Sequence, residues 1–266
     1  MKSEEHMNER YFTIGEIPAK LYEGGRAERA LLALHGFGGS KESRAIKLLA
    51  QRLCDRDFAV LAIDWRCHGE RKCSFSSLTA ENCFADMAAA SGWLSQNVSD
   101  DISVFATSFG GYVTLLDTLS GKTPFRRIAL RVPAVNMADS LLSCARASQD
   151  NPQGGRDEQN ALILEEARSS GFFRVRTGEE FRVPVAAYDM FAGLSAVRAF
   201  PALESVPVAV VYAENDELVR RADTERFLEL NPAVKSLMIR GCGHRMAESE
   251  QALAQALDFA ADFLSE

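Results

Sequence analysis

The feature that most constrains the fold of this chain is the regular alternation of buried strands with amphipathic helices. Apolar runs rich in β-branched residues predict the strands, and apolar residues at helical spacing predict the helices between them. This alternation is typical of a mostly parallel sheet that carries helices on both faces. The sequence therefore predicts an α/β fold, with strands at residues 29–37, 58–66, 101–107, 125–133, 206–214 and 235–241 and helices at 41–57, 79–97, 110–120, 220–230 and 248–266.

Two segments interrupt the alternation. Residues 10–23 predict an antiparallel hairpin ahead of the parallel strands. Residues 134–204 are expected to form helices at 137–147 and 161–170 and a hairpin at 172–187, with its turn at Thr177-Gly178. We interpret this second segment as a cap inserted over the carboxyl edge of the sheet. The predicted domains are therefore a core made of residues 1–133 and 205–266 and a cap made of residues 134–204.

The composition excludes several functional classes. With 266 residues and a net charge of −7, the chain is long enough for one large α/β domain and lacks the basic surface that nucleic-acid binding needs. No apolar run reaches about 20 residues, the length of a membrane span, and the charged N-terminus has no signal-peptide core. The six cysteines show no metal-ligand spacing, so we expect free thiols, no metal, no cofactor and a cytoplasmic location.

Chemically active side chains stand at the carboxyl ends of the predicted strands. Ser108, Asp216 and His244 each follow such a strand, and so does His35. Ligands of open parallel sheets bind outside this edge. The order Ser, Asp, His along the chain is that of a catalytic triad, in which the imidazole takes the proton of the serine and the carboxylate orients the imidazole. We therefore predict that Ser108, Asp216 and His244 are catalytic.

The sequence also indicates two donors for an oxyanion hole. The backbone N–H of Phe109 begins a helix, where N–H groups have no intrahelical partner. The backbone N–H of Phe37, in the loop "HGFGG", is the expected second donor. Two such amides stabilise the oxyanion that forms during acyl transfer. No residue is assigned to substrate binding.

These motifs together resemble those of the α/β-hydrolase superfamily over nearly the whole chain. The matching segments are "HGFGGS" for the oxyanion loop, "DWRCHGE" for a D-x-R-G-H-G-type segment, "ATSFGG" for the nucleophile turn, "YAENDELV" for the acid loop and "GCGH" for the histidine loop. Ala106 stands where the nucleophile turn usually has glycine, and Cys67 replaces the glycine of the R-G-H-G pattern. The layout of the cap hairpin is similar to that of bacterial cinnamoyl/feruloyl esterases and related cytoplasmic serine hydrolases. The resemblance implies an α/β-hydrolase fold and a cofactor-free serine hydrolase.

Several residues have alternative interpretations. The competitors of Asp216 for the role of the acid are Glu214, Glu217 and Asp223, and Asp216 is preferred because its offset fits the acid loop. His35 and His68 are expected to brace their loops rather than to act as bases. A charged loop contains Asp64, Arg66, Glu70 and Arg71. Its two interpretations are contact with a substrate and a surface ion-pair network, and the network is preferred.

Two features of the predicted cap stay ambiguous. Its aromatic residues either line an acyl pocket or hold the cap to the core: Phe172, Phe173, Phe181, Tyr188 and Phe191. Every basic residue from 123 to 234 is an arginine. Arginine is suited to binding a substrate carboxylate or phosphate, but compositional bias is the preferred explanation.

The first functional hypothesis is a serine esterase that cleaves small or medium-sized acyl or aryl esters through an acyl-enzyme. The second hypothesis keeps the triad in a thioesterase, an acyltransferase or a small-peptide hydrolase. The third is a non-catalytic binding protein on the same fold, ranked last because no member of the triad is lost. The expected partner is a small-molecule ester, with no nucleic acid and no membrane, and a homodimer stays open.

Overall fold

An eight-stranded sheet forms the centre of the molecule. The computed structural model describes residues 7–120, 125–149, 155–176, 180–247 and 249–266. The strand order in the sheet is β1-β2-β4-β3-β5-β6-β9-β10, in which β2 runs antiparallel to β1 and β4 and the strands from β4 to β10 run parallel. The bounds are β1 (Asn8–Ile14), β2 (Ile17–Glu23), β3 (Arg29–Leu34), β4 (Phe58–Ile63), β5 (Ile102–Thr107), β6 (Ile128–Arg131), β9 (Val208–Ala213) and β10 (Lys235–Ile239). The predicted mostly parallel sheet and the N-terminal hairpin are confirmed.

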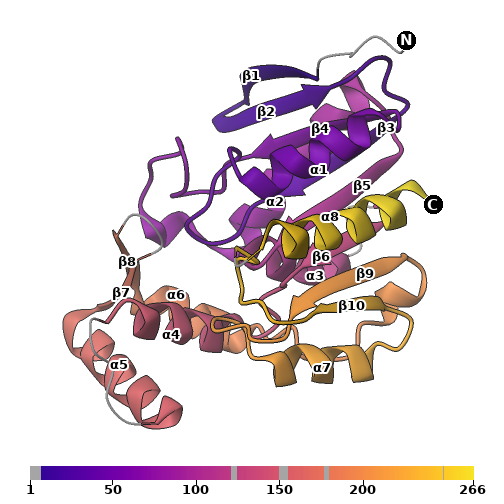
Figure 1. The fold of residues 1–266 in the computed structure, drawn as a ribbon. Coiled ribbons are helices and arrows are strands. Elements are labelled where there is room, and N and C mark those ends of the chain that lie inside the picture. The colour runs from indigo at the N-terminus through magenta and orange to yellow at the C-terminus, as the bar shows by residue number, and fades with distance from the viewer. Residues whose placement is uncertain (1–6, 121–124, 150–154, 177–179, 248) are drawn as a thin grey trace.

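Helices cover both faces of the sheet (Figure 1). The helices α1 and α8 pack together over one face, and α2, α3 and α7 pack on the other. Their bounds are α1 (Arg44–Cys54), α2 (Ala80–Asn97), α3 (Phe109–Ser120), α7 (Arg221–Leu230) and α8 (Glu250–Ser265). Central strands such as β4 and β5 are buried along their whole length, because a parallel strand between two helical layers has no solvent face.

The first helix is shorter than the predicted segment 41–57. It begins at Arg44, because Lys41 is held outside the helix by the buried side chain of Asp64. The backbone N–H of Lys41 donates to Asp64 Oδ1 at 2.7 Å, and its ammonium group lies 3.3 Å from Asp64 Oδ2. A contact between residues this far apart in the chain has no periodic signature in the sequence.

The elements between β6 and β9 gather beyond one end of the sheet (Figure 1). They are α4 (Met137–Ala147), α5 (Arg156–Ser170), β7 (Phe172–Arg176), β8 (Glu180–Pro184) and α6 (Val185–Gly193). We call residues 134–204, which contain them, the inserted segment. The strands β7 and β8 pair only with each other, as an antiparallel hairpin whose predicted turn at Thr177-Gly178 lies outside the described residues.

Two predictions within the inserted segment are wrong in their bounds. The helix predicted at 161–170 begins at Arg156, within a stretch that its polar composition predicted to be a loop. The hairpin predicted to reach residue 187 ends at Pro184, and the following residues form α6. Proline is well suited to the start of a helix, since the first N–H groups of a helix have no intrahelical partner.

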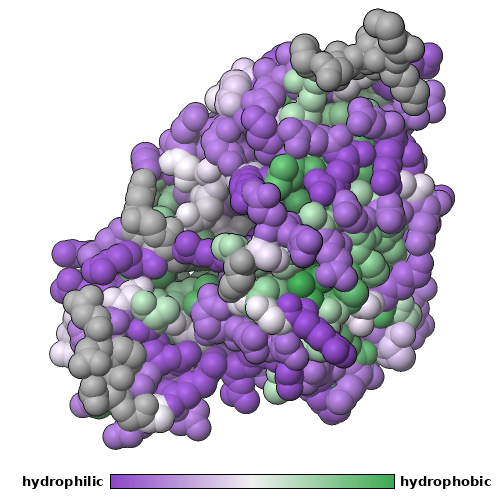
Figure 2. Space-filling view, in the orientation of Figure 1, coloured by the Kyte–Doolittle hydropathy of each residue, from purple (hydrophilic) through white to green (hydrophobic). Residues whose placement is uncertain are grey.

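The face of the molecule drawn in Figure 2 is mostly hydrophilic, with hydrophobic areas interrupted by polar residues. In the part of the chain that the structure describes, no helix combines the length and the apolar character that crossing a membrane requires.

Candidate active site

Ser108 occupies a strained turn between β5 and α3. Its φ is +52°, in the left-handed region that costs a non-glycine residue about 1 kcal/mol. The neighbouring chain holds this conformation through three backbone hydrogen bonds. The Ser108 N–H donates to Arg131 O, and the Ser108 carbonyl accepts from the N–H groups of Tyr112 and Ala134, each at 3.0 Å. The predicted strand-to-helix turn is therefore present, and Ala106 fits within it as a fully buried residue.

The loops after β9 and β10 bring Asp216 and His244 to Ser108. His244 Nε2 lies 3.0 Å from Ser108 Oγ. On the other side of the ring, His244 Nδ1 lies 3.0 and 2.9 Å from the two carboxylate oxygens of Asp216. Because an ionised carboxylate only accepts hydrogen bonds, Nδ1 carries the proton and Nε2 offers a lone pair to the serine hydroxyl. This is the geometry that a serine needs for activation by a general base.

Asp216 is the acid that reaches the imidazole, in preference to its three sequence competitors. Its Oδ1 also accepts from the N–H groups of Leu218 and Val219, at 2.9 and 2.7 Å, which holds the carboxylate in place. The competitors have other partners: Glu214 accepts from the Gly241 N–H, Glu217 accepts from the His244 backbone N–H, and Asp223 accepts from the Asn136 side chain. Glu217 therefore positions the histidine loop, while Asp216 contacts the ring.

The loop after β3 lies directly against Ser108. A Cβ on Gly36 would stand 3.0 Å from Ser108 Cβ, so any larger residue would displace this loop from the serine. The next residue is Phe37, whose amide was predicted to be an oxyanion donor. Among the described residues, neither the Phe37 N–H nor the Phe109 N–H has a hydrogen-bond acceptor. Both amides therefore keep the free N–H that an oxyanion donor requires.

His35 braces this loop from below. It is buried, its Nδ1 lies 2.8 Å from Gly36 O, and its Nε2 accepts from the backbone N–H of Trp65 at 3.2 Å. This pattern requires the neutral ring with its proton on Nδ1. Burial lowers the pKa of His35 to about 3, so the ring stays neutral at physiological pH. The contacts support the bracing role expected from the sequence.

A cavity of about 260 Å³ opens beside Ser108. Its lining includes His244 and the glycine-rich loop from Gly36 to Gly39. It also includes six residues that the sequence analysis did not assign to the site: Ser43, Thr107, Arg131, Cys144, Leu218 and Arg245. Arg131 ends β6, so the rule that ligands bind at the carboxyl ends of parallel strands would have identified it. Cys144 comes from α4 and brings the inserted segment to the edge of this cavity.

The sequence matches the family model described as "Alpha/beta hydrolase family" over residues 31–256. The chain belongs to the alpha/beta hydrolase family.

Solved structures of this fold resemble the chain along its whole length. A putative hydrolase from Agrobacterium vitis is 15% identical, with a TM-score of 0.73, and the alignment covers 97% of this chain and 99% of that one. Est1E from Butyrivibrio proteoclasticus, solved with bound ferulic acid, is 16% identical, with a TM-score of 0.69 and coverage of 97% and 100%. Mouse alpha/beta hydrolase domain-containing protein 10 is 14% identical, with a TM-score of 0.71 and coverage of 97% and 98%. No curated protein matches the sequence significantly.

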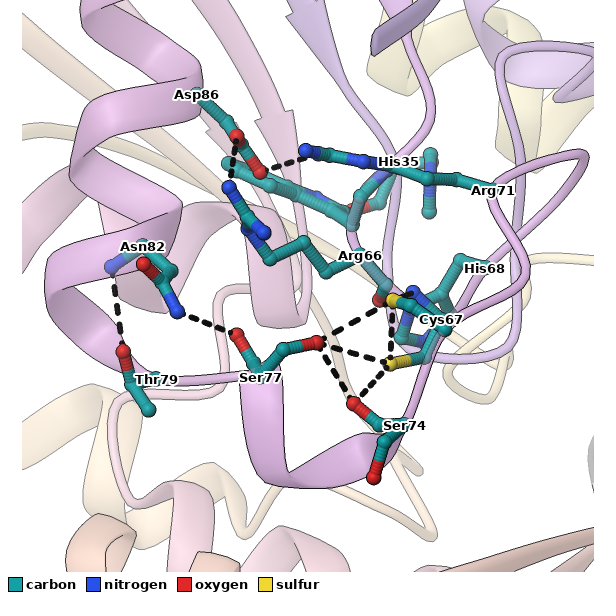
Figure 3. A network of polar contacts seen from close by, with 12 residues as sticks. His35, Arg66, Cys67, His68, Arg71, Ser74, Ser77, Thr79, Asn82 and Asp86 are labelled. Atoms are coloured by element: carbon teal, nitrogen blue, oxygen red, sulfur yellow. Dashed lines mark hydrogen bonds and ion pairs between the residues drawn. The ribbon is translucent and has the colours of Figure 1, made fainter. Parts of the chain in front are cut away.

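In this alpha/beta hydrolase, the loop after β4 carries a buried ion-pair network (Figure 3). Arg66 and Arg71 point at Asp86 of α2, with N–O distances of 3.3 and 2.5 Å. Asp64 is fully buried and pairs with Lys41. The predicted surface location is therefore wrong for Asp64 and Arg71, which are buried, whereas Glu70 is exposed and Arg66 is half-buried.

His68 packs inside an aromatic cluster of this hydrolase. Its ring lies 5.0 Å from Phe37 and 5.8 Å from Phe181, measured between centroids. Burial lowers the pKa of His68, and its Nδ1 lies 2.7 Å from Arg66 O. His68 therefore supports Phe37, the residue whose amide is the predicted oxyanion donor.

The aromatic residues of the inserted segment mostly serve packing. Phe181 contacts Phe37, and Phe191 contacts Phe109, with ring centroids 5.7 and 6.0 Å apart. Phe172 and Phe173 line a different cavity of about 110 Å³ within the inserted segment, and Tyr188 packs on Phe173. None of these five is among the described residues that line the cavity beside Ser108. In the described ranges, no cluster of three or more His, Cys, Asp or Glu side chains is arranged to hold a metal ion.

Proposed function

We propose that this alpha/beta hydrolase is a serine esterase that cleaves carboxylic esters through an acyl-enzyme. Ser108 is the proposed nucleophile, His244 the general base, Asp216 the residue that orients it, and the amides of Phe37 and Phe109 the oxyanion donors. The observation that carries the proposal is the continuous chain of contacts from Ser108 Oγ through the His244 ring to the Asp216 carboxylate.

In the first half-reaction, Ser108 Oγ attacks the ester carbonyl while its proton passes to His244 Nε2. The imidazolium that forms is stabilised by Asp216, and the negative charge on the carbonyl oxygen is stabilised by the two amides. Collapse of this intermediate breaks the ester bond, and His244 returns the proton to the departing alcohol. The alcohol leaves, and the acyl group stays on Ser108.

In the second half-reaction, water takes the place of the alcohol. His244 removes a proton from the water, whose oxygen attacks the acyl carbonyl held in the same oxyanion hole. Release of Ser108 Oγ gives the carboxylic acid and restores the hydroxyl. The chemistry needs no metal or organic cofactor, since every proton transfer uses the one imidazole.

The size of the cavity supports a small or medium-sized ester. Its volume of about 260 Å³ lies slightly below the usual range for pockets that hold drug-sized ligands. The net charge of −7 supports a partner other than nucleic acid. The division into core and cap, the cytoplasmic location and a homodimeric assembly stay predictions from the sequence.

A fluorophosphonate probe tests the proposal directly. We expect one covalent adduct on the protein, located at Ser108 by peptide mass spectrometry and absent in Ser108→Ala. Ser43→Ala, which removes another serine hydroxyl from the cavity lining, is the matched control and should keep the adduct at Ser108. An adduct that persists in Ser108→Ala, or no adduct on the folded protein, would contradict the assignment.

A substrate panel then separates the reactions that share this triad. Aryl esters, including a feruloyl ester, acyl thioesters and peptide amides are compared by kcat/KM. The proposal predicts the highest values for esters. Higher values for thioesters or amides would leave the triad assignment in place and change the proposed substrate class. Labelling of Ser108 without turnover of any substrate in the panel would favour a binding protein.

A further inference from the structure

A second cavity, of about 290 Å³, adjoins the one beside Ser108. Ser43, Arg131 and Arg245 line both cavities, so a ligand bound at Ser108 can extend from one into the other. The second cavity lies between the N-terminal ends of α1 and α8. Its described lining contains three arginines and one carboxylate: Arg44, Arg131, Arg245 and Glu250.

Arg131 is a buried cation, 8% exposed, that makes no ion-pair contact with a carboxylate of the described residues. The charge of Asp216 acts on Arg131 from beyond ion-pair distance, and the Asp216 carboxylate is itself paired with His244. Its Nη1 makes one long hydrogen bond, 3.5 Å to Arg245 O, and its Nε has no partner. Burial lowers the pKa of Arg131 to about 10, so it is charged at neutral pH. Burying a charge with so few contacts is unfavourable, and a bound anion would offset that cost.

The other groups around the cavity reinforce its positive charge. Ser43 is the N-cap residue of α1 but makes no side-chain capping bond, which leaves the first N–H groups of the helix without an internal acceptor. The N-terminus of α8 meets it from the other side. Both helix dipoles favour a negative charge at this point. Glu250 does not neutralise the cavity, because its side chain is 89% exposed and paired with Arg44 at 3.0 Å.

We propose that this second cavity binds an anionic group, a carboxylate or a phosphate, carried by the ester substrate. The proposal rests on the proposed esterase activity and deepens it, because it names the substrate class as esters with a negative charge beyond the scissile bond. The fork of N–H groups on Arg131 matches the oxygens of either anion. Arg245 lies on the exposed side and would contact the anion as it enters.

Matched substrates test the proposal. On the acyl side, p-nitrophenyl hemiglutarate is compared with p-nitrophenyl butyrate. On the alcohol side, 4-carboxyphenyl butyrate is compared with phenyl butyrate. We expect wild-type kcat/KM to favour the anionic member of one pair by about tenfold or more, the usual scale of a charge-assisted contact.

For each variant, kcat/KM for the anionic ester is divided by kcat/KM for the matched neutral ester, and this ratio is compared with that of the wild type. Arg131→Met should remove most of the preference, and Arg131→Lys should restore part of it. If Arg131→Met does not fold, Arg245→Met tests the same cavity from its exposed side. Arg240→Met is the matched control, since Arg240 is exposed and does not line either cavity, and it should keep the wild-type ratio.

Inhibition of p-nitrophenyl butyrate hydrolysis by inorganic phosphate and by glutarate shows which of the two anions the cavity prefers. We expect the preferred anion to inhibit Arg131→Met less strongly than the wild type. Equal kcat/KM within both substrate pairs, or a preference that survives in the cavity variant, would overturn the proposal. If the wild-type protein hydrolyses the anionic and neutral esters equally well, only the anion-binding inference is wrong and the esterase assignment stands. Absence of both turnover and fluorophosphonate labelling would instead remove the esterase assignment.

A separate observation concerns two thiols in the loop after β4 (Figure 3). Cys67 Sγ lies 3.1 Å from Cys73 Sγ. The Cys67 backbone N–H and the Ser77 hydroxyl both donate to Cys73 Sγ, at 3.0 and 3.3 Å. Partial burial raises the pKa of the Cys73 thiol, but these donors and nearby Arg71 outweigh it and lower the pKa overall. Cys73 is exposed to solvent, whereas Cys67 is buried beneath it.

We infer that Cys67 and Cys73 form a disulfide when a hydroperoxide oxidises Cys73. The Cys73 thiolate attacks the O–O bond and becomes a sulfenic acid, and one molecule of water or alcohol leaves. Cys67 then attacks the sulfenic sulfur, which releases water and closes the S–S bond. Two thiols are oxidised and one peroxide is reduced.

Intact-mass measurement after treatment with hydrogen peroxide tests this inference. We expect a loss of about 2 Da that dithiothreitol reverses, and a linked pair of Cys67 and Cys73 in the peptide map. Cys73→Ser should abolish the loss, and Cys144→Ser, outside the pair, should keep it. Stable oxygen addition at Cys73 without cross-linking, or a loss that persists in Cys73→Ser, would overturn the inference.

Discussion

His244 Nε2 lies 3.0 Å from Ser108 Oγ, although 136 positions separate the two residues in the chain. The contact exists because β5 and β10 end at the same edge of the sheet, with β6 and β9 between them. Asp216, at the end of β9, holds the far side of the imidazole ring. Parallel strands thus bring three distant loops to one point, and the backbone contacts of each loop determine which side chain it presents.

Asp216→Asn tests the orienting role of the carboxylate. An amide at this position can donate to Nδ1 and so favours the tautomer that cannot accept the serine proton. We expect kcat for a butyrate ester to fall by about three to four orders of magnitude, with the melting temperature little changed. Asp223→Asn, which alters a carboxylate that contacts Asn136 instead, should keep kcat within about twofold. Similar losses in the two variants would contradict the assignment of Asp216.

Gly36→Ala tests the contact between the oxyanion loop and the serine. The added methyl group would stand 3.0 Å from Ser108 Cβ, so the loop must shift and move the Phe37 amide. We expect kcat to fall by about 10- to 100-fold, because small displacements of catalytic groups are costly. Gly92→Ala in α2 is the control: its Cβ would meet no atom within 4 Å, and alanine should stabilise the helix by about 0.5–1 kcal/mol. Unchanged kcat in Gly36→Ala would show that the loop is not closely fitted to the serine.

The buried histidines predict how stability depends on pH. The pKa of His35 is about 3 in the folded chain and about 6.5 in the unfolded chain, so the unfolded state binds the extra proton between these values. Stability is therefore fully present above pH 6.5 and falls as the pH drops towards 3, by about 1.4 kcal/mol per pH unit for this residue. His68, whose pKa is also lowered by burial, adds to the same trend.

Urea unfolding between pH 6 and 4.5 measures this slope. His35→Gln should reduce it relative to the wild type, whatever the effect of the substitution on stability at pH 7.5. Parallel curves for the two proteins would mean that His35 does not carry the proton linkage.

The buried pair of Asp64 and Lys41 predicts a large stability effect. Asp64 accepts from two backbone N–H groups and from the Lys41 ammonium group, and both side chains are almost fully buried. The Lys41 ammonium group also pairs with the exposed Glu70 at 2.7 Å. Asp64→Asn should lower the free energy of unfolding by about 3 kcal/mol, because it removes the buried charge of this network and leaves Lys41 only its exposed partner. Glu229→Gln, which breaks the exposed pair with Arg226, should cost less than about 0.5 kcal/mol. Urea denaturation measures both values, and equal effects would contradict the importance of burial.

Much of the site could be predicted because its chemistry is local in sequence. A strand, a serine and a helix within a few residues predict the turn at Ser108, and the φ of +52° agrees with that prediction. Arg131 was missed because compositional bias was a sufficient explanation for an arginine in an arginine-rich stretch. The burial of Arg131, with its Nε left without a hydrogen-bond partner, is a property of packing, which one-dimensional patterns do not record.

The sequence by itself determined the alternation of strands and helices and therefore the mostly parallel sheet, since hydrophobic periodicity reflects local burial. It also determined which polar residues stand at the ends of strands. Only the tertiary structure decided that Asp216, rather than Glu214 or Glu217, reaches the imidazole, and that Asp64 and Arg71 are buried. These outcomes depend on contacts between loops far apart in the chain, and such contacts leave no periodic signature in the order of the residues.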